Sequence, residues 1–144
     1  MTYSTNTDVQ NAAGGAASLA ALADFDGDGI ADATVIAAAQ AAADGMINSY
    51  LAKRFAVPMS SPPADVVELA ARLAVHRMRI ARQTVTQGDT DQNALDIKWL
   101  EGVRDGKNVP GTDPVPAASA LQVDTAGTRD STKLTSRERL KGFW

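Results

Sequence analysis

The sequence contains no cysteine and only one histidine, His76. Without thiols the chain forms no disulfide, offers no thiolate to a metal and has no cysteine nucleophile. Such a composition fits a reducing cytoplasm, or a particle assembled there. A lone histidine has no second imidazole with which to share a metal. Because His76 falls on or beside an apolar stripe, we interpret it as a core or interface residue.

Long hydrophobic runs are also missing. No window of about 18 apolar residues occurs, so we expect no segment that spans a membrane. The first ten residues, MTYSTNTDVQ, lack the basic region and apolar run of a signal peptide. There is no glycine-rich phosphate loop and no G-x-S-x-G nucleophile motif. We therefore predict that the protein is not an enzyme.

Alanine dominates what is present. Of the 144 residues 44% are hydrophobic, many of them alanine, and only 5% are aromatic. Alanine has the highest helix propensity and a small side chain, so this composition favours closely packed helices over a sheet. The length suits one domain with an added arm or tail.

Hydrophobic periodicity places the helices and divides the chain. One or two short helices are expected in residues 5–23, broken near Gly14 and Gly15, followed by longer helices at about 33–54, 64–83 and 89–104. We predict an all-α fold: a three- to four-helix bundle in residues 1–107, an extended proline-containing arm in 108–130 and a docking tail in 131–144.

The same periodicity predicts which side chains are buried in the three long helices. The expected stripes are Ile36, Ala39, Ala43, Met46 or Ile47 and Tyr50; Leu69, Leu73, His76 and Ile80; and Leu95, Trp99, Leu100 and Val103.

Four arginines share the helix expected at 64–83. They are Arg72, Arg77, Arg79 and Arg82. One interpretation is a solvated helix flank with some pairing between residues four apart. The other is an inter-subunit contact strip that meets an acidic neighbour, including another copy of the chain. Arg77 lies so close to the apolar face that we expect a carboxylate beside it.

The stretch DFDGDGIAD resembles a calcium loop. Counting from Asp24, the ligand positions hold Asp24, Asp26, Asp28, the Ile30 carbonyl and Asp32. Position 12 is Val35 in place of the bidentate glutamate, and its loss should weaken binding severely. The alternative is an acidic turn in which Asp32 caps the following helix. We expect no cofactor, with a structural calcium ion as the open alternative.

Charge is unevenly distributed. Residues 128–144 carry a net charge of +3, and the rest of the chain carries −6. Within the basic end, Thr135 and Glu138 have the spacing of a capping box, and Phe143 and Trp144 follow. A single helical turn cannot bury two large aromatic side chains, so we expect this tail to dock on a partner.

Several ordered stretches resemble the head–tail connector (adaptor, head-completion) family of Mu-like phages and prophages. They are DFDGDGIAD leading into an alanine-rich helix, INSYLAKRFAVPM, VVELA continuing to HRM, IKWLEGVRDGK and TSRERLKGF. Together they cover residues 3–109 and 131–143. The linker PGTDPVPAASALQVDTAGTRD is longer and richer in proline than is usual in this family, so the path of the arm stays open.

The resemblance implies a virion protein at the neck, assembled in the host cytoplasm. It would form a ring of about twelve copies under the portal, extend the DNA channel without sequence-specific binding, and carry the next neck or tail-completion protein. The portal-docking residues implied by the family are Thr135, Arg137, Arg139, Leu140, Phe143 and Trp144. Two alternatives remain, a small calcium-binding helical module and another neck component such as a tail terminator.

Overall fold

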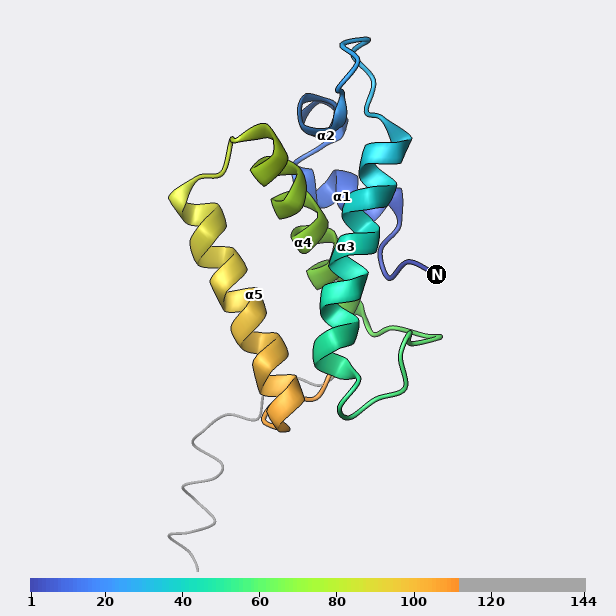
Figure 1. Cartoon of the computed structure of the whole chain (residues 1–144), viewed down its shortest axis with the longest axis vertical. Helices are drawn as coiled ribbons and strands as arrows, with labels where there is room; N and C mark the ends of the chain where they lie inside the picture. Colours follow the sequence, from blue (N-terminus) through green and yellow to red (C-terminus); the bar gives the residue numbers. More distant parts are fainter. Residues whose placement is uncertain (112–144) are drawn as a thin grey trace, which may run out of the picture. The chain divides into compact units, whose positions relative to one another are not determined.

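The computed structural model describes residues 1–111, and five helices occupy most of that part (Figure 1). They are α1 (Asn6–Ala13), α2 (Ala16–Ala23), α3 (Ala33–Leu51), α4 (Ala64–Arg82) and α5 (Gln87–Asp105). No strand occurs within these 111 residues, which confirms the all-α prediction. None of the five helices is long and apolar enough to cross a membrane.

The three long helices form the body, and α4 lies at its centre. α3 has its most extensive contacts with α4, α1 packs on α4, and α5 contacts both α3 and α4. Figure 1 shows that α5 and α3 are well separated where α5 begins and lie close together where α5 ends. The expected three- to four-helix bundle is therefore a five-helix arrangement, because residues 5–23 form two short helices.

Two capping boxes fix the starts of α1 and α5. Thr5 precedes α1 and accepts from the Asp8 backbone N–H, while the Asp8 carboxylate accepts from the Thr5 N–H. Thr86 and Asp89 repeat this arrangement before α5. α5 thus begins at Gln87, two residues before the predicted start, because the box needs its capping residue three positions ahead of the acid.

Gly14 ends α1 in the left-handed region, at φ 94°. Gly106 does the same for α5 at φ 83°, and the Arg54 side chain lies directly over its Cα. A left-handed C-cap strongly favours glycine, because a Cβ is strained there. These two glycines give the predicted break after Ala13 and the predicted stop after Asp105.

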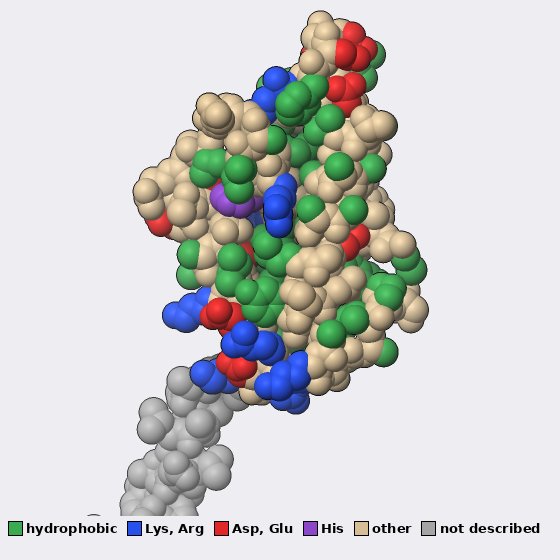
Figure 2. Space-filling view, in the orientation of Figure 1, with side chains coloured by type: hydrophobic (Ala, Val, Ile, Leu, Met, Phe, Trp, Pro, Cys, Tyr) green, Lys and Arg blue, Asp and Glu red, His purple; other side chains and the backbone are tan. Residues whose placement is uncertain are grey.

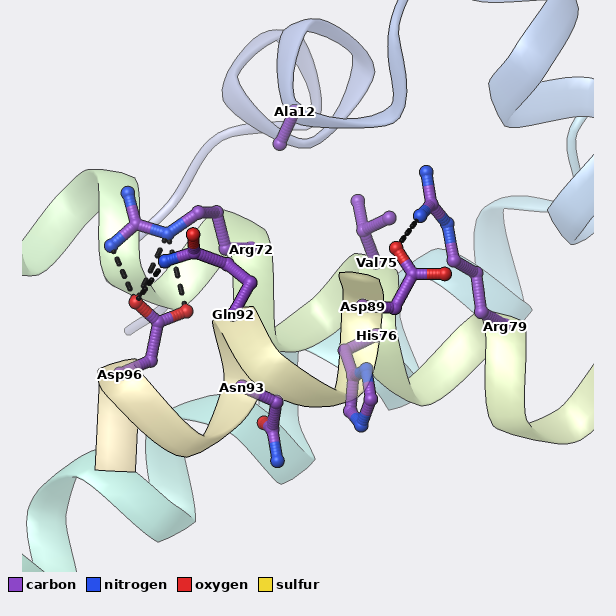
Figure 3. A pocket seen from close by; sticks show the side chains of 9 residues that line it. All are labelled: Ala12, Arg72, Val75, His76, Arg79, Asp89, Gln92, Asn93 and Asp96. Atoms are coloured by element: carbon purple, nitrogen blue, oxygen red, sulfur yellow. Dashed lines mark hydrogen bonds and ion pairs between the residues drawn. The ribbon is translucent and has the colours of Figure 1, made fainter. Parts of the chain in front are cut away.

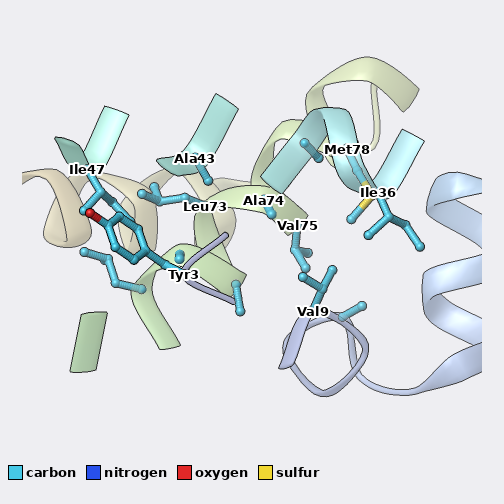
Figure 4. Packing of buried hydrophobic residues seen from close by; sticks show 14 of the residues in the cluster. Tyr3, Val9, Ile36, Ala43, Ile47, Leu73, Ala74, Val75 and Met78 are labelled. Atoms are coloured by element: carbon cyan, nitrogen blue, oxygen red, sulfur yellow. The ribbon is translucent and has the colours of Figure 1, made fainter. Parts of the chain in front are cut away.

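The core lies between α3 and α4 and is completed by the other helices (Figure 4). Ile47 and Leu51 of α3, Leu69 and Met78 of α4, and Leu100 of α5 have at most 2% of their surface exposed. The predicted α3 stripe is confirmed, with Ile47 in preference to Met46 facing the core and Tyr50 only half-buried.

The predicted stripes on α4 and α5 are wrong at one position each. Ile80 is 52% exposed and Leu95 is 60% exposed. Ile80 lies in the last turn of α4, and Met78 is buried there instead. α5 is rotated so that Asp96 faces α4, where it meets Arg72, and this rotation turns Leu95 outward.

The N-terminal segment is anchored on α3. Tyr3 is 4% exposed, its hydroxyl donates to Asn48 Oδ1, and the Met59 N–H donates back to it over 3.0 Å. The Tyr3 N–H donates to the Asp44 carboxylate at 3.3 Å, and Gln40 donates to the Ser4 carbonyl at 2.9 Å. Residues before α1 thus belong to the folded body.

Residues 108–111 also pack on the body, although the sequence placed them in the arm. Asn108 donates through its side chain to the Trp99 carbonyl at 3.2 Å, and the Gly111 N–H donates to Asp65 at 2.8 Å. The described chain therefore ends beside the start of α4.

Candidate functional site

The acidic loop between α2 and α3 brings three carboxylates together. Oxygens of Asp24, Asp26 and Asp28 all lie within 4.8 Å of one another. Backbone N–H groups of the loop fold onto these carboxylates: Gly27 and Gly29 donate to Asp24 at 2.6 and 2.8 Å, and Ile30 donates to Asp28 at 2.7 Å. Three of the five predicted ligand positions thus lie together, in a loop whose backbone N–H groups donate to its own carboxylates.

Asp32 closes this loop in a way the sequence did not predict. It occupies the N-cap position of α3, but its side chain caps no helix N–H. Its carboxylate accepts from the Phe25 N–H at 2.8 Å, and its own N–H donates to the Ala23 carbonyl at 3.1 Å. Val35, at position 12, lies inside α3 and packs against the core.

The carboxylates of the loop differ in acidity. The N–H groups of Gly29 and Gly27 lower the pKa of Asp24, because they stabilise its charged form. The Asp28 N–H lowers the pKa of Asp26, but desolvation and the charges of Asp28 and Asp32 outweigh it, so the pKa of Asp26 is raised. Repulsion within the loop therefore centres on Asp26.

Two of the four α4 arginines form ion pairs with α5. Arg72 donates from Nη2 to Asp96 at 2.9 Å and from Nε at 3.2 Å, and it also lies 3.9 Å from Glu68. The Asp96 side chain is only 6% exposed. Arg79 pairs with Asp89, whose pKa is lowered by the hydrogen bonds from Thr86 and by the arginine. These pairs hold α5 on α4.

Arg82 instead joins α4 to the acidic loop and the end of α2. Its Nε donates to the Leu22 carbonyl at 3.1 Å, and its guanidinium carbon lies 3.9 Å from the centre of the Phe25 ring. Such stacking of a guanidinium on an aromatic face is a favourable cation–π contact. Phe25 itself remains 52% exposed.

Arg77 is the exception among the four. Its side chain is exposed, and within residues 1–111 no carboxylate pairs with it. The carboxylate expected beside it is therefore not found in the described part of the chain. The α5 acids lie next to Arg72 and Arg79, because those arginines share the α5-facing side of α4.

His76 lies in a small polar pocket of about 140 Å³ between α1, α4 and α5 (Figure 3). Arg72, Arg79, Asp89 and Asp96 line it, and all four are engaged in the ion pairs described above. His76 Nδ1 is buried and has no hydrogen-bond partner among the described residues. The walls of this pocket are thus charged groups that connect helices.

The expected docking residues, Thr135 to Trp144, lie outside the described residues. An apolar surface groove, however, was missed at the level of sequence. It lies between α3 and α4 and is floored mainly by alanines. Exposed alanines carry no distinctive sequence signal, since the same residue type also fills the buried contacts of these helices.

Comparison with known proteins identifies the class. The family model described as "Bacteriophage Mu, Gp36" matches residues 3–126, which includes all five helices, and the chain belongs to that family. It is thus a protein of Mu-like phages. A relative in Escherichia phage Mu, "Gene product J", is 32% identical over 116 residues, covering 81% of this chain and 80% of the relative. The family match ends before the tail at 131–144.

Proposed function

We propose that the protein is a structural head–tail connector of a Mu-like phage, with no catalytic role. The observation that carries this proposal is its membership of a Mu phage family across the whole helical body. Four of the five sequence stretches that resemble phage adaptors lie in the described part of the chain, in the α2–α3 loop, on α3, α4 and α5, and in the α3–α4 connection; the fifth, TSRERLKGF, lies outside it. In this role the protein occupies the neck of the virion.

The arrangement of polar groups supports a structural role. Arg72 and Arg79 connect α4 to α5, and Arg82 connects α4 to α2. Catalytic sites instead keep titratable groups free to face a substrate. The charged groups of Arg72, Arg79 and Arg82 therefore serve to join helices.

In the proposed assembly about twelve copies form a ring beneath the portal. The ring lengthens the DNA channel and carries the next neck or tail-completion protein. Outside residues 128–144 the chain has a net charge of −6, so DNA would pass the ring without being retained. The basic tail, with Phe143 and Trp144 as aromatic anchors, binds the portal.

Removing the gene from the phage tests this role. We expect infected cells to accumulate DNA-packaging heads and separate, complete tails, because nothing joins the two. Adding the purified protein to the mixed lysate should restore infective particles, and electron microscopy of those particles should show it as a ring at the neck. Normal virions made without the protein would contradict the proposal.

We propose, as a second candidate function, that the acidic loop holds a structural calcium ion. The three clustered carboxylates of Asp24, Asp26 and Asp28 favour it. We expect calcium at ten times its Kd to stabilise the fold by about 1.4 kcal/mol, seen as a higher melting temperature. The Asp26→Ala/Asp28→Ala variant should lose this shift, while Asp91→Ala on α5 should retain it. Equal melting temperatures in calcium and in chelator would contradict the calcium site, and the loop would then be a hydrogen-bonded turn only.

A further inference from the structure

The groove between α3 and α4 is the most apolar of the surface hollows described on residues 1–111. It has a volume of about 380 Å³ and is lined by Ala38 and Ala42 of α3, Met78 and Ala81 of α4, and Phe25 at the acidic loop. Arg77 lies at its rim. Figure 2 shows hydrophobic side chains on both sides of a basic one on this face.

Small side chains make this groove suitable for another helix. Thr34, Ala38 and Ala42 are spaced by four residues, as are Arg77 and Ala81. Rows with this spacing bound the grooves into which a ridge of a second helix packs. Because alanine extends so little from the backbone, a ridge of larger side chains would fit between the two rows.

The outer flank of α5 carries such a ridge. Asp91, Leu95 and Trp99 follow one another at intervals of four; Leu95 is 60% exposed, and Trp99 is partly exposed and also packs against the core of its own chain. Arg104 lies nine residues after Leu95, half a turn around the helix, and its guanidinium carbon is 5.8 Å from the Tyr50 ring of α3. Leu95 therefore points away from α3, so ridge and groove lie on different sides of the body.

The charges left over on α4 and α5 are complementary. α4 has four arginines, and Arg77 alone has neither an ion pair nor an aromatic or carbonyl partner within residues 1–111. On α5, Asp89 and Asp96 are paired with arginines, whereas Asp91 accepts only from the neutral Gln87 amide at 2.9 Å. Arg77 at the groove and Asp91 on the ridge are thus two opposite charges that have no ion pair within residues 1–111.

We propose that the ridge of one copy, Asp91–Leu95–Trp99, packs into the α3–α4 groove of the next copy. Leu95 fills the alanine-lined floor and Asp91 pairs with Arg77. Two different surfaces meet in this contact, so it repeats from copy to copy, and it forms the ring of the proposed function when the rotation between neighbouring copies closes. The inference rests on the ring of the proposed function and names the surfaces that build it.

Cross-linking tests the contact directly, because the chain has no cysteine of its own. Ala42→Cys and Leu95→Cys variants with different tags would be co-expressed during infection by phage lacking the gene. Purified particles are then treated with a short bismaleimide. We expect a cross-linked dimer that carries both tags, and no dimer when either variant is used alone. As a matched control, Ala21→Cys, on the exposed side of α2, is co-expressed with Leu95→Cys in place of Ala42→Cys. This pair should give no cross-linked dimer.

A charge exchange provides the second measurement. Arg77→Asp and Asp91→Arg should each reduce incorporation into particles at least tenfold, and the double variant should restore it. Both substitutions lie on exposed side chains, so circular dichroism should stay unchanged.

The possible failures separate the two proposals. Normal incorporation with no dual-tag dimer would overturn the interface while leaving the connector role intact. A cross-link from Ala42→Cys to a different phage protein would assign the groove to another occupant and overturn the interface as well. Absence of the protein from particles would contradict both the interface and the connector role.

Discussion

Deleting residues 135–144 is expected to leave the helical body folded and to abolish the joining of heads to tails. The buried core identified in the structure lies entirely within residues 3–103, so the truncation removes none of its contacts. The truncation removes three of the five basic residues of the 128–144 segment, together with Phe143 and Trp144. An aromatic pair of this kind dominates the binding energy when it anchors in a pocket of a partner.

The measurement has two parts. Circular dichroism and thermal melting of the truncated protein should match the full chain within about 0.5 kcal/mol, as for changes remote from the core. Particle titre from cells that supply only the truncated protein should fall to the level found without the gene. Phe143→Ala/Trp144→Ala, which keeps the length and charge of the tail, should reproduce most of this loss. Full titre with the truncated chain would refute the docking role.

Replacing Arg72 with alanine is expected to cost the fold about 2–3 kcal/mol, somewhat less than the loss of a fully buried ion-pair partner. The substitution leaves the Asp96 carboxylate, with its side chain 6% exposed, without its guanidinium. Gln92 still donates to it at 3.1 Å, but an amide offsets little of the lost charge interaction. The 39% exposure of the Arg72 side chain lets water enter, which is why we expect the lower figure.

Arg77→Ala is the matched control, since Arg77 lies on the same helix and has no ion pair within residues 1–111. It should change stability by no more than about 0.5 kcal/mol. Urea unfolding of Arg72→Ala, Asp96→Ala and the double variant would measure the coupling between the pair. We expect the double variant to be less destabilised than the sum of the single variants. Equal, small effects of Arg72→Ala and Arg77→Ala would show that the pair contributes nothing.

Local rules account for most of what was predicted correctly. The all-α class follows from alanine content and helical periodicity, and the break between α1 and α2 follows from Gly14, whose left-handed backbone ends α1. The start of α5 was predicted at residue 89, two residues after Gln87, where the helix begins behind its cap Thr86. A capping box was available as a signal there.

The errors arose where contacts between helices decide which face of a helix is buried. Periodicity placed Leu95 in the core, but the Arg72–Asp96 pair sets the rotation of α5 and leaves Leu95 exposed. A carboxylate partner was expected at Arg77 and was found at Arg72 and Arg79 instead. Sequence spacing gives the faces of a single helix but cannot state which face a neighbouring helix covers.

By itself, the sequence determined the helical class, the positions of the helices to within a few residues, the acidic loop and the separation of an acidic body from a basic tail. These follow from propensity, capping and charge, which act over a few neighbouring residues. The tertiary structure alone decided which arginines are paired, that Tyr3 is anchored on α3, and that alanines of α3 and α4 line an open groove. Those features depend on contacts between residues far apart in the chain, whose packing no local pattern encodes.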